Sequence, residues 1–132
     1  MLNKVTLIGR LGKDPEVKTF EGNSKVANFT LATDEKYRDS QGNIKSQTEW
    51  HNIVAWRNQA DIAEKYLKKG MLIYIEGKLK HRSWDDKDGI KRYATDIVVD
   101  MLRMLEKSNN DYNPEQTKSK DVIEQMESDL PF

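Results

Sequence analysis

Three tryptophans lie in stretches where apolar and polar residues alternate. Trp50 and Trp56 are six residues apart in "QTEWHNIVAW" (47–56). In a β-strand this spacing points both side chains to one face, about 20 Å apart. In "MLIYIEGKLKHRSW" (71–84), Trp84 shares its alternate positions with three cations, Lys78, Lys80 and Arg82. The two stretches therefore predict strand faces that combine indole rings with amide or cationic groups.

These residue types suit an unpaired polynucleotide. An indole ring is a flat surface on which any base can stack, and Lys and Arg neutralise phosphates. The bases of a duplex are already stacked on each other, so exposed rings favour a single strand. Two simpler interpretations stay open: Trp50 or Trp56 could belong to the hydrophobic core, and the three cations could form an ordinary solvated face. A β-bulge would exchange the two faces of a strand.

The sequence offers few residues for a catalytic or metal centre. It has no cysteine and only two histidines, His51 and His81, which excludes a thiolate site and the usual zinc cluster. Three aspartates, Asp85, Asp86 and Asp88, lack the spacing and closing glutamate of a calcium loop. A nuclease that uses them remains an alternative, but no acid/base cluster accompanies them. We expect a solvated turn at 85–89, no enzyme activity, no cofactor and no metal.

The periodicity predicts an all-β domain with one helix. Alternation predicts strands within 4–12, 24–33, 47–56, 71–84 and 90–105. A helical period replaces it in "NQADIAEKYLKKG" (58–70), where Asn58 would cap the helix and Gly70 would end it. This order is that of the OB-fold, a five-stranded, partly open barrel with one helix between strands 3 and 4. Other folds share the same order of elements.

Alternation also predicts which residues of these strands form the core. Ala27, Phe29 and Leu31 share one face of the second expected strand. In the fourth, one apolar face contains Ile73, Ile75 and Leu79. We expect both faces to point into the barrel.

Charge divides the chain near residue 105. Residues 1–105 carry 19 Lys and Arg against 15 Asp and Glu, whereas residues 106–132 carry 3 against 7. We therefore divide the chain into an OB-fold domain (1–105), a flexible polar linker (106–120) and an acidic tip (121–132) in a disordered tail. No long apolar run suggests a secretory signal or a span of roughly 20 residues. We expect a soluble cytoplasmic protein.

The chain resembles the bacterial single-stranded-DNA-binding proteins over essentially its whole length. The matching segments are "NKVTLIGRLGKDPEVK", "VANFTLAT", "QTEWH", "AEKYLKKG", "IYIEGKLKHRSW" and "RYATDIVV". The closing "DLPF" is similar to the family's acidic, apolar-ended tip. Several motifs in one order are more specific than a shared fold. The resemblance implies an OB-fold that assembles as a homotetramer, with single-stranded DNA wrapped around it and a location at the nucleoid.

The resemblance also implies roles for individual residues. The family's base-stacking aromatics fall on four positions, Tyr37, Trp50, Trp56 and Trp84. Tyr37 replaces a more usual tryptophan, Trp56 stands where phenylalanine is common, and His51 matches a histidine near a subunit contact. The tip is the family's docking peptide for replication, recombination and repair proteins. Its closing residues here are Asp129, Leu130, Pro131 and Phe132.

Our main hypothesis is therefore a non-enzymatic protein that coats single-stranded DNA without strong sequence preference and recruits partners through its tip. A second hypothesis is an adaptor that acts mainly through the tail and binds nucleic acid weakly. RNA as the ligand is also open, because stacking does not detect the 2′-hydroxyl.

Overall fold

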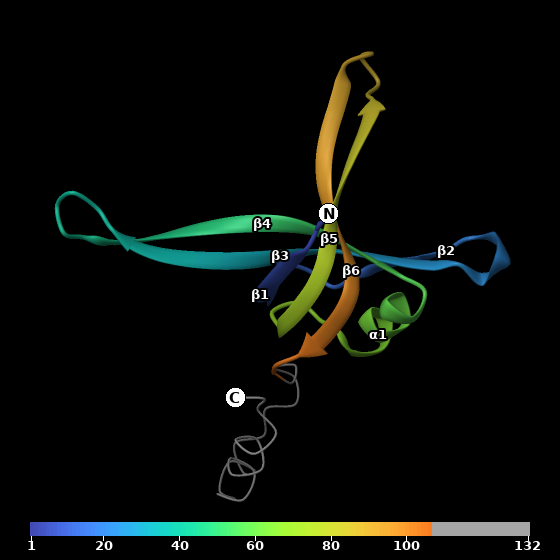
Figure 1. Ribbon diagram of the computed structural model, residues 1–132, viewed down its shortest axis with the longest axis horizontal. Helices are drawn as coiled ribbons and strands as arrows, with labels where there is room; N and C mark the ends of the chain where they lie inside the picture. Colours follow the sequence, from blue (N-terminus) through green and yellow to red (C-terminus); the bar gives the residue numbers. More distant parts are fainter. Residues whose placement is uncertain (107–132) are drawn as a thin grey trace, which may run out of the picture.

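Six strands and one α-helix make up the computed structural model, which describes residues 1–106 (Figure 1). The strands are β1 (Val5–Leu11), β2 (Glu16–Thr19), β3 (Lys25–Arg38), β4 (Ile44–Trp56), β5 (Leu72–Asp85) and β6 (Lys91–Met104). The α-helix, α1, spans Asn58–Tyr66, and a short 3₁₀ helix, η1, spans Glu21–Asn23. Within residues 1–106, no helix is long and apolar enough to cross a membrane.

The sheet closes into a barrel. Its strand order is β1-β5-β6-β4-β3-β2, and β1 also pairs with β3. Closure needs a close approach at Gly9, where a Cβ atom would lie 2.3 Å from the carbonyl oxygen of Ala32. The expected OB-fold is confirmed. Its helix lies between the third and fourth expected strands, which are β4 and β5 because β2 was not predicted.

Strand alternation places the core as expected along the barrel. Ala27, Phe29 and Leu31 of β3 are buried, as are Ile73 and Ile75 of β5. The helix α1 buries Ala60 and Ala63 and contacts β3, β4 and β6. These side chains belong to one apolar cluster that extends from Leu11 to Leu102 in the sequence.

Two long hairpins project beyond the barrel (Figure 1). The β3–β4 arm is longer than expected, because β3 continues to Arg38 and β4 begins at Ile44. The β5–β6 arm contains Leu79, which is exposed. The prediction of Leu79 in the core is wrong, since the strand has left the barrel at that point and its apolar face has no layer to pack against.

Both predicted ends of the helix are wrong. The cap position is Arg57, with a positive φ of 53° and no side-chain cap, and Asn58 is already helical. The helix ends at Tyr66, because Leu67 is extended. Gly70, with φ of 87°, lies in the turn that follows. The segment that begins at Leu67 and contains Gly70 connects the helix to β5.

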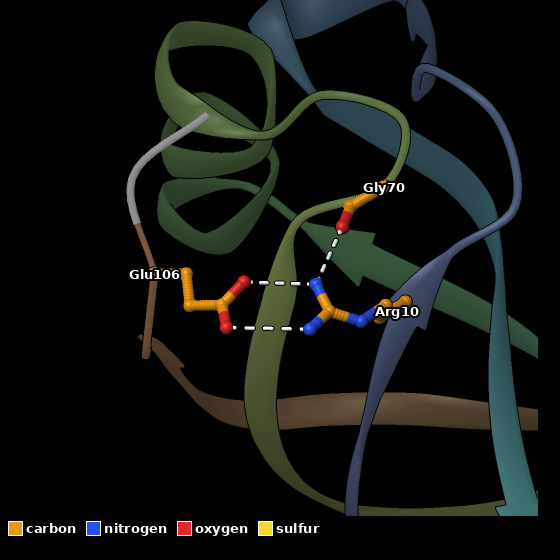
Figure 2. Close-up of polar contacts among 3 residues, drawn as sticks. All are labelled: Arg10, Gly70 and Glu106. Atoms are coloured by element: carbon orange, nitrogen blue, oxygen red, sulfur yellow. Dashed lines mark hydrogen bonds and ion pairs between the residues drawn. The ribbon is translucent and has the colours of Figure 1, made fainter. Parts of the chain in front are cut away.

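The last described residue is tied to the barrel by Arg10 (Figure 2). Arg10 Nη1 and Nη2 donate hydrogen bonds to the two carboxylate oxygens of Glu106 at 2.8 and 3.2 Å. Nη1 also donates to the carbonyl oxygen of Gly70 at 3.0 Å. The hydrogen bond from Arg10 lowers the pKa of Glu106 below its ordinary value. The end of β6 is thereby joined to β1 and to the loop before β5.

Candidate nucleic-acid interface

Trp50 and Trp56 of β4 both point away from the core. Their exposed fractions are 60% and 45%, whereas Ile53 and Ala55 between them are buried. The alternative of a core tryptophan is therefore wrong for both residues. As expected from their even spacing, the two rings lie on one outer face of the sheet.

The same outer face continues through β6 to β5. Asn52 of β4 pairs with Asp96 of β6, and Asp96 pairs with Lys80 of β5. Directly paired residues of a sheet point to the same side, so Lys80 lies on the face of Trp50. Alternation along β5 adds Trp84, which is 43% exposed. The structure therefore brings the three tryptophans and the predicted cations Lys78, Lys80 and Arg82 onto one surface.

A shallow polar hollow lies on this surface. Its volume is about 200 Å³. The residues that line it come from β3, β4, β5 and β6 and from the loop after β1: Lys13, Asn28, Phe29, Thr30, Asn52, Ile53, Val54, Arg82 and Asp96. Amide, hydroxyl and charged groups at the floor can hydrogen-bond a base or phosphate that lies across the sheet.

Trp50 is positioned by a glycine of the loop after β1. A Cβ atom on Gly12 would lie 2.4 Å from Cζ3 of Trp50 and 2.7 Å from Oγ1 of Thr30. The edge of the indole therefore packs directly over the backbone. This contact limits the movement of a side chain that is otherwise largely in water.

Arg82 is already engaged with two neighbours. Its Nε donates to Oδ2 of Asp96 at 2.7 Å, and its Cζ lies 4.7 Å from the ring centroid of Trp84. Asp96 is only 8% exposed, so Arg82 compensates a carboxylate that is poorly solvated. Among the ion pairs of residues 1–106, none includes Lys78 or Lys80. These two lysines carry the uncompensated positive charge of the strand.

Tyr37 lies apart from the tryptophans. It is exposed on the β3–β4 arm and pairs with Lys45. Alternation along β3 gives it the side of Phe29 and Leu31, and no register shift interrupts the β3–β4 ladder. The structure therefore does not bring Tyr37 onto the face of Trp50. A ligand would have to pass around the arm to reach it.

His51 lies on the inner side of β4, as predicted from alternation. It is half-buried, and its Nε2 lies 2.9 Å from Oγ1 of Thr33. This contact joins β3 to β4 at the base of the arm.

Of the three aspartates near the β5–β6 turn, Asp86 has a structural role. Asp86 Oδ1 accepts hydrogen bonds from the backbone N–H groups of Asp88 and Ile90 at 2.9 Å, and Oδ2 accepts a hydrogen bond from the side-chain Nε of Arg92 at 2.9 Å. The hydrogen bond from the backbone N–H of Ile90 is the main cause that lowers the pKa of Asp86 below its ordinary value, and the hydrogen bond from Arg92 is the second. In the part of the chain that the structure describes, no three His, Cys, Asp or Glu residues could hold a metal ion.

Sequence reasoning missed several residues of this surface, among them Asp96 and Phe20. Asp96 was a polar residue within the apolar run "ATDIVV", and that interruption was a signal for a paired carboxylate. Phe20 stacks on Trp56, with ring centroids 6.4 Å apart. It follows β2, a strand too short to show a period. The predicted docking residues Asp129, Leu130, Pro131 and Phe132 lie outside the described residues.

Comparison with known proteins decides the family. The model of the single-strand binding protein family matches residues 2–105. The chain belongs to this family. The resemblance inferred from its motifs is confirmed, and membership agrees with the expectation that the chain is not an enzyme.

Named relatives of this family match the same region. The chain is 57% identical over 105 residues to single-stranded DNA-binding protein 1 of Chlorobaculum tepidum, covering 79% of this chain and 65% of that protein. It is 51% identical over 104 residues to the single-stranded DNA-binding protein of Neisseria meningitidis serogroup A, covering 79% and 60%. The match spans less than two thirds of these relatives' length.

A solved structure shares the fold. The Plasmodium falciparum SSB, in complex with ssDNA, has a TM-score of 0.75 and 39% sequence identity. The similarity covers 80% of this chain and 97% of that chain. The fold of this chain is therefore similar to that of a protein whose structure contains single-stranded DNA.

Proposed function

We propose that this protein binds single-stranded DNA without strong sequence preference. The observation that carries the proposal is the outer face of β4, β6 and β5, which contains three partly exposed tryptophans and two lysines without an ion pair, Lys78 and Lys80. Similarity to an SSB in complex with ssDNA supports it. Bases stack on the rings, the lysines neutralise phosphates, and Tyr37 adds a contact when the strand passes around the β3–β4 arm.

The chemistry favours single strands over a duplex. Each base stacked on an aromatic ring contributes about 1–3 kcal/mol and does so for every base type. A duplex would have to unstack its bases to gain this energy. Stacking on an aromatic ring does not distinguish one base from another, so we expect weak sequence preference.

A fluorescence titration tests this proposal. We expect oligo(dT) to quench tryptophan fluorescence, and binding to weaken as salt rises. Trp50→Ala and Trp84→Ala should each weaken binding by about 1–3 kcal/mol. Tyr93→Ala is the matched control, because Tyr93 is an exposed aromatic on the opposite side of the β5–β6 arm from Trp84. Unchanged fluorescence at low salt would reject the proposal. Tighter binding to RNA of equal length would show that RNA, and not single-stranded DNA, is the preferred ligand.

We further propose that the chain acts as a homotetramer at the nucleoid and protects single-stranded DNA during replication, recombination and repair. Residues 1–105 form the binding domain, 106–120 the linker and 121–132 the tip that recruits partner enzymes. Deletion of 121–132 should leave DNA binding intact and abolish capture of those enzymes. If DNA binding were lost and capture retained, the division of roles would be wrong. Light scattering of the intact protein tests the tetramer.

A further inference from the structure

Phe20 and Trp56 form an aromatic pair at one end of the outer face. Their ring centroids are 6.4 Å apart, with an angle of 27° between the ring planes. Phe20 is 52% exposed, so the pair is not a buried packing contact. Phe20 lies in the connection between β2 and β3, and this hairpin projects from the barrel on the side away from the β3–β4 arm (Figure 1).

Strand register places a cation beside this pair. Lys18 of β2 pairs with Val26 of β3, and Val26 pairs with Trp56 of β4. Lys18 therefore points to the same side of the sheet as Trp56. Phe20 is two residues further along and is held by a hydrogen bond from its N–H to the carbonyl oxygen of Ser24 at 2.7 Å. Lys18 is exposed, and no ion pair within residues 1–106 involves it.

We infer that Phe20, Trp56 and Lys18 form a nucleotide subsite at this end of the face. Bases stack on the two-ring surface, and Lys18 neutralises a phosphate of the same segment. The subsite extends the path of the bound DNA strand. This path runs from Trp50 along about 20 Å of β4 to Trp56 and then onto the β2–β3 hairpin. This inference rests on the proposed binding of single-stranded DNA and specifies where that strand continues.

A simpler role for Phe20 is to cover one side of the Trp56 ring. The two roles differ in which replacement preserves binding. A cover needs only apolar volume, which leucine supplies, whereas stacking needs an aromatic ring, which tyrosine supplies. Phe20→Leu and Phe20→Tyr therefore form a matched pair, and neither changes the charge of the chain.

The experiment uses the full chain with Trp50→Phe and Trp84→Phe. Trp56 is then its only tryptophan, and an aromatic ring remains at positions 50 and 84. Oligo(dT) should quench Trp56. Phe20→Ala and Phe20→Leu should each lower the affinity about 5-fold or more, since one stacked base contributes at least about 1 kcal/mol. Phe20→Tyr should bind like the parent. Lys18→Gln should reduce the slope of log affinity against log salt by about 0.7.

The outcomes separate this inference from the proposal on which it rests. If the chain with all three tryptophans does not bind oligo(dT), both are wrong. If that chain binds, and the Phe20→Ala and Phe20→Leu variants bind as tightly as the Trp50→Phe/Trp84→Phe chain, only the subsite is overturned. If Phe20→Leu binds like the parent while Phe20→Ala does not, Phe20 is an apolar cover and the stacking role is wrong. Unchanged far- and near-UV circular dichroism verifies the fold of each variant.

Discussion

The ion pair between Arg82 and Asp96 predicts that Arg82 does not act as a phosphate-binding cation. The sequence places Arg82 with Lys78 and Lys80, and all three were expected to neutralise phosphates. The structure separates them, because Arg82 Nε is 2.7 Å from Asp96 Oδ2 and its guanidinium lies over Trp84. A phosphate near this pair meets a positive and a negative charge together. Binding at this position therefore releases few counterions from the DNA.

The size of the effect follows from counterion release. Each phosphate neutralised on a single strand contributes about 0.7 to the slope of log affinity against log salt. Lys80→Gln should therefore reduce the slope by about 0.7. Over a fourfold rise in salt, the affinity of this variant should fall about 2.6-fold less than the affinity of the unchanged protein. Asp96→Asn frees Arg82 and should steepen the slope by up to about 0.7. The double variant Arg82→Gln/Asp96→Asn should leave the slope unchanged.

The double variant should still bind more weakly at every salt concentration. It loses the guanidinium that holds the Trp84 ring, a contact of about 0.5–1 kcal/mol at an exposed site, or about 2- to 5-fold in affinity. The assay is a set of oligo(dT) titrations at several salt concentrations, followed by tryptophan fluorescence. If the double variant lowered the slope as much as Lys80→Gln does, Arg82 would bind phosphate directly and the argument would be refuted.

Two further predictions concern Trp50 and the arm. Gly12→Ala should displace the Trp50 ring, because the new Cβ would lie 2.4 Å from it. The tryptophan emission maximum should shift and the affinity for DNA should fall. If neither value changes, the Trp50 ring moves freely and Gly12 does not position it. The lowered pKa of Asp86 means that its turn-stabilising bonds persist above the ordinary value near 4 and are lost as pH falls through the lowered value. Amide chemical shifts of Asp88 and Ile90 should report that transition, and it should be absent in Asp86→Ala.

Features that depend on one strand were predictable from the sequence. Trp50 and Trp56 lie on one outer face because even spacing within β4 determines their side, whatever the neighbouring strands are. The same rule placed Phe29 and Leu31 in the core. The order of strands and helix was consistent with the OB-fold but is shared by other folds, so the resemblance of the motifs to a known family was needed to select it.

Features that depend on another strand were not predictable. Leu79 satisfies the apolar alternation of β5, but no rule within the strand shows where it leaves the barrel. Arg82 looks like Lys80 until β6 places Asp96 beside it. The resemblance assigned Tyr37 a stacking role. Only the β3–β4 register shows that its side chain lies on the opposite side of the sheet from Trp50. Pairing between strands carries this information, and one sequence does not contain it explicitly.

The same distinction changes how the charge of the chain relates to its ligand. Arg10 is committed to Glu106, and Lys25 bonds Asp61 and Glu64, which raises the pKa of Lys25. Such pairs are present in the free protein and are not available to phosphates. Within residues 1–106, Lys18, Lys78 and Lys80 make no ion pair, and the strand registers place them on the outer face that contains the tryptophans. The positive excess of residues 1–105 is therefore less important than its position, because these unpaired charges lie on the face with the exposed indole rings.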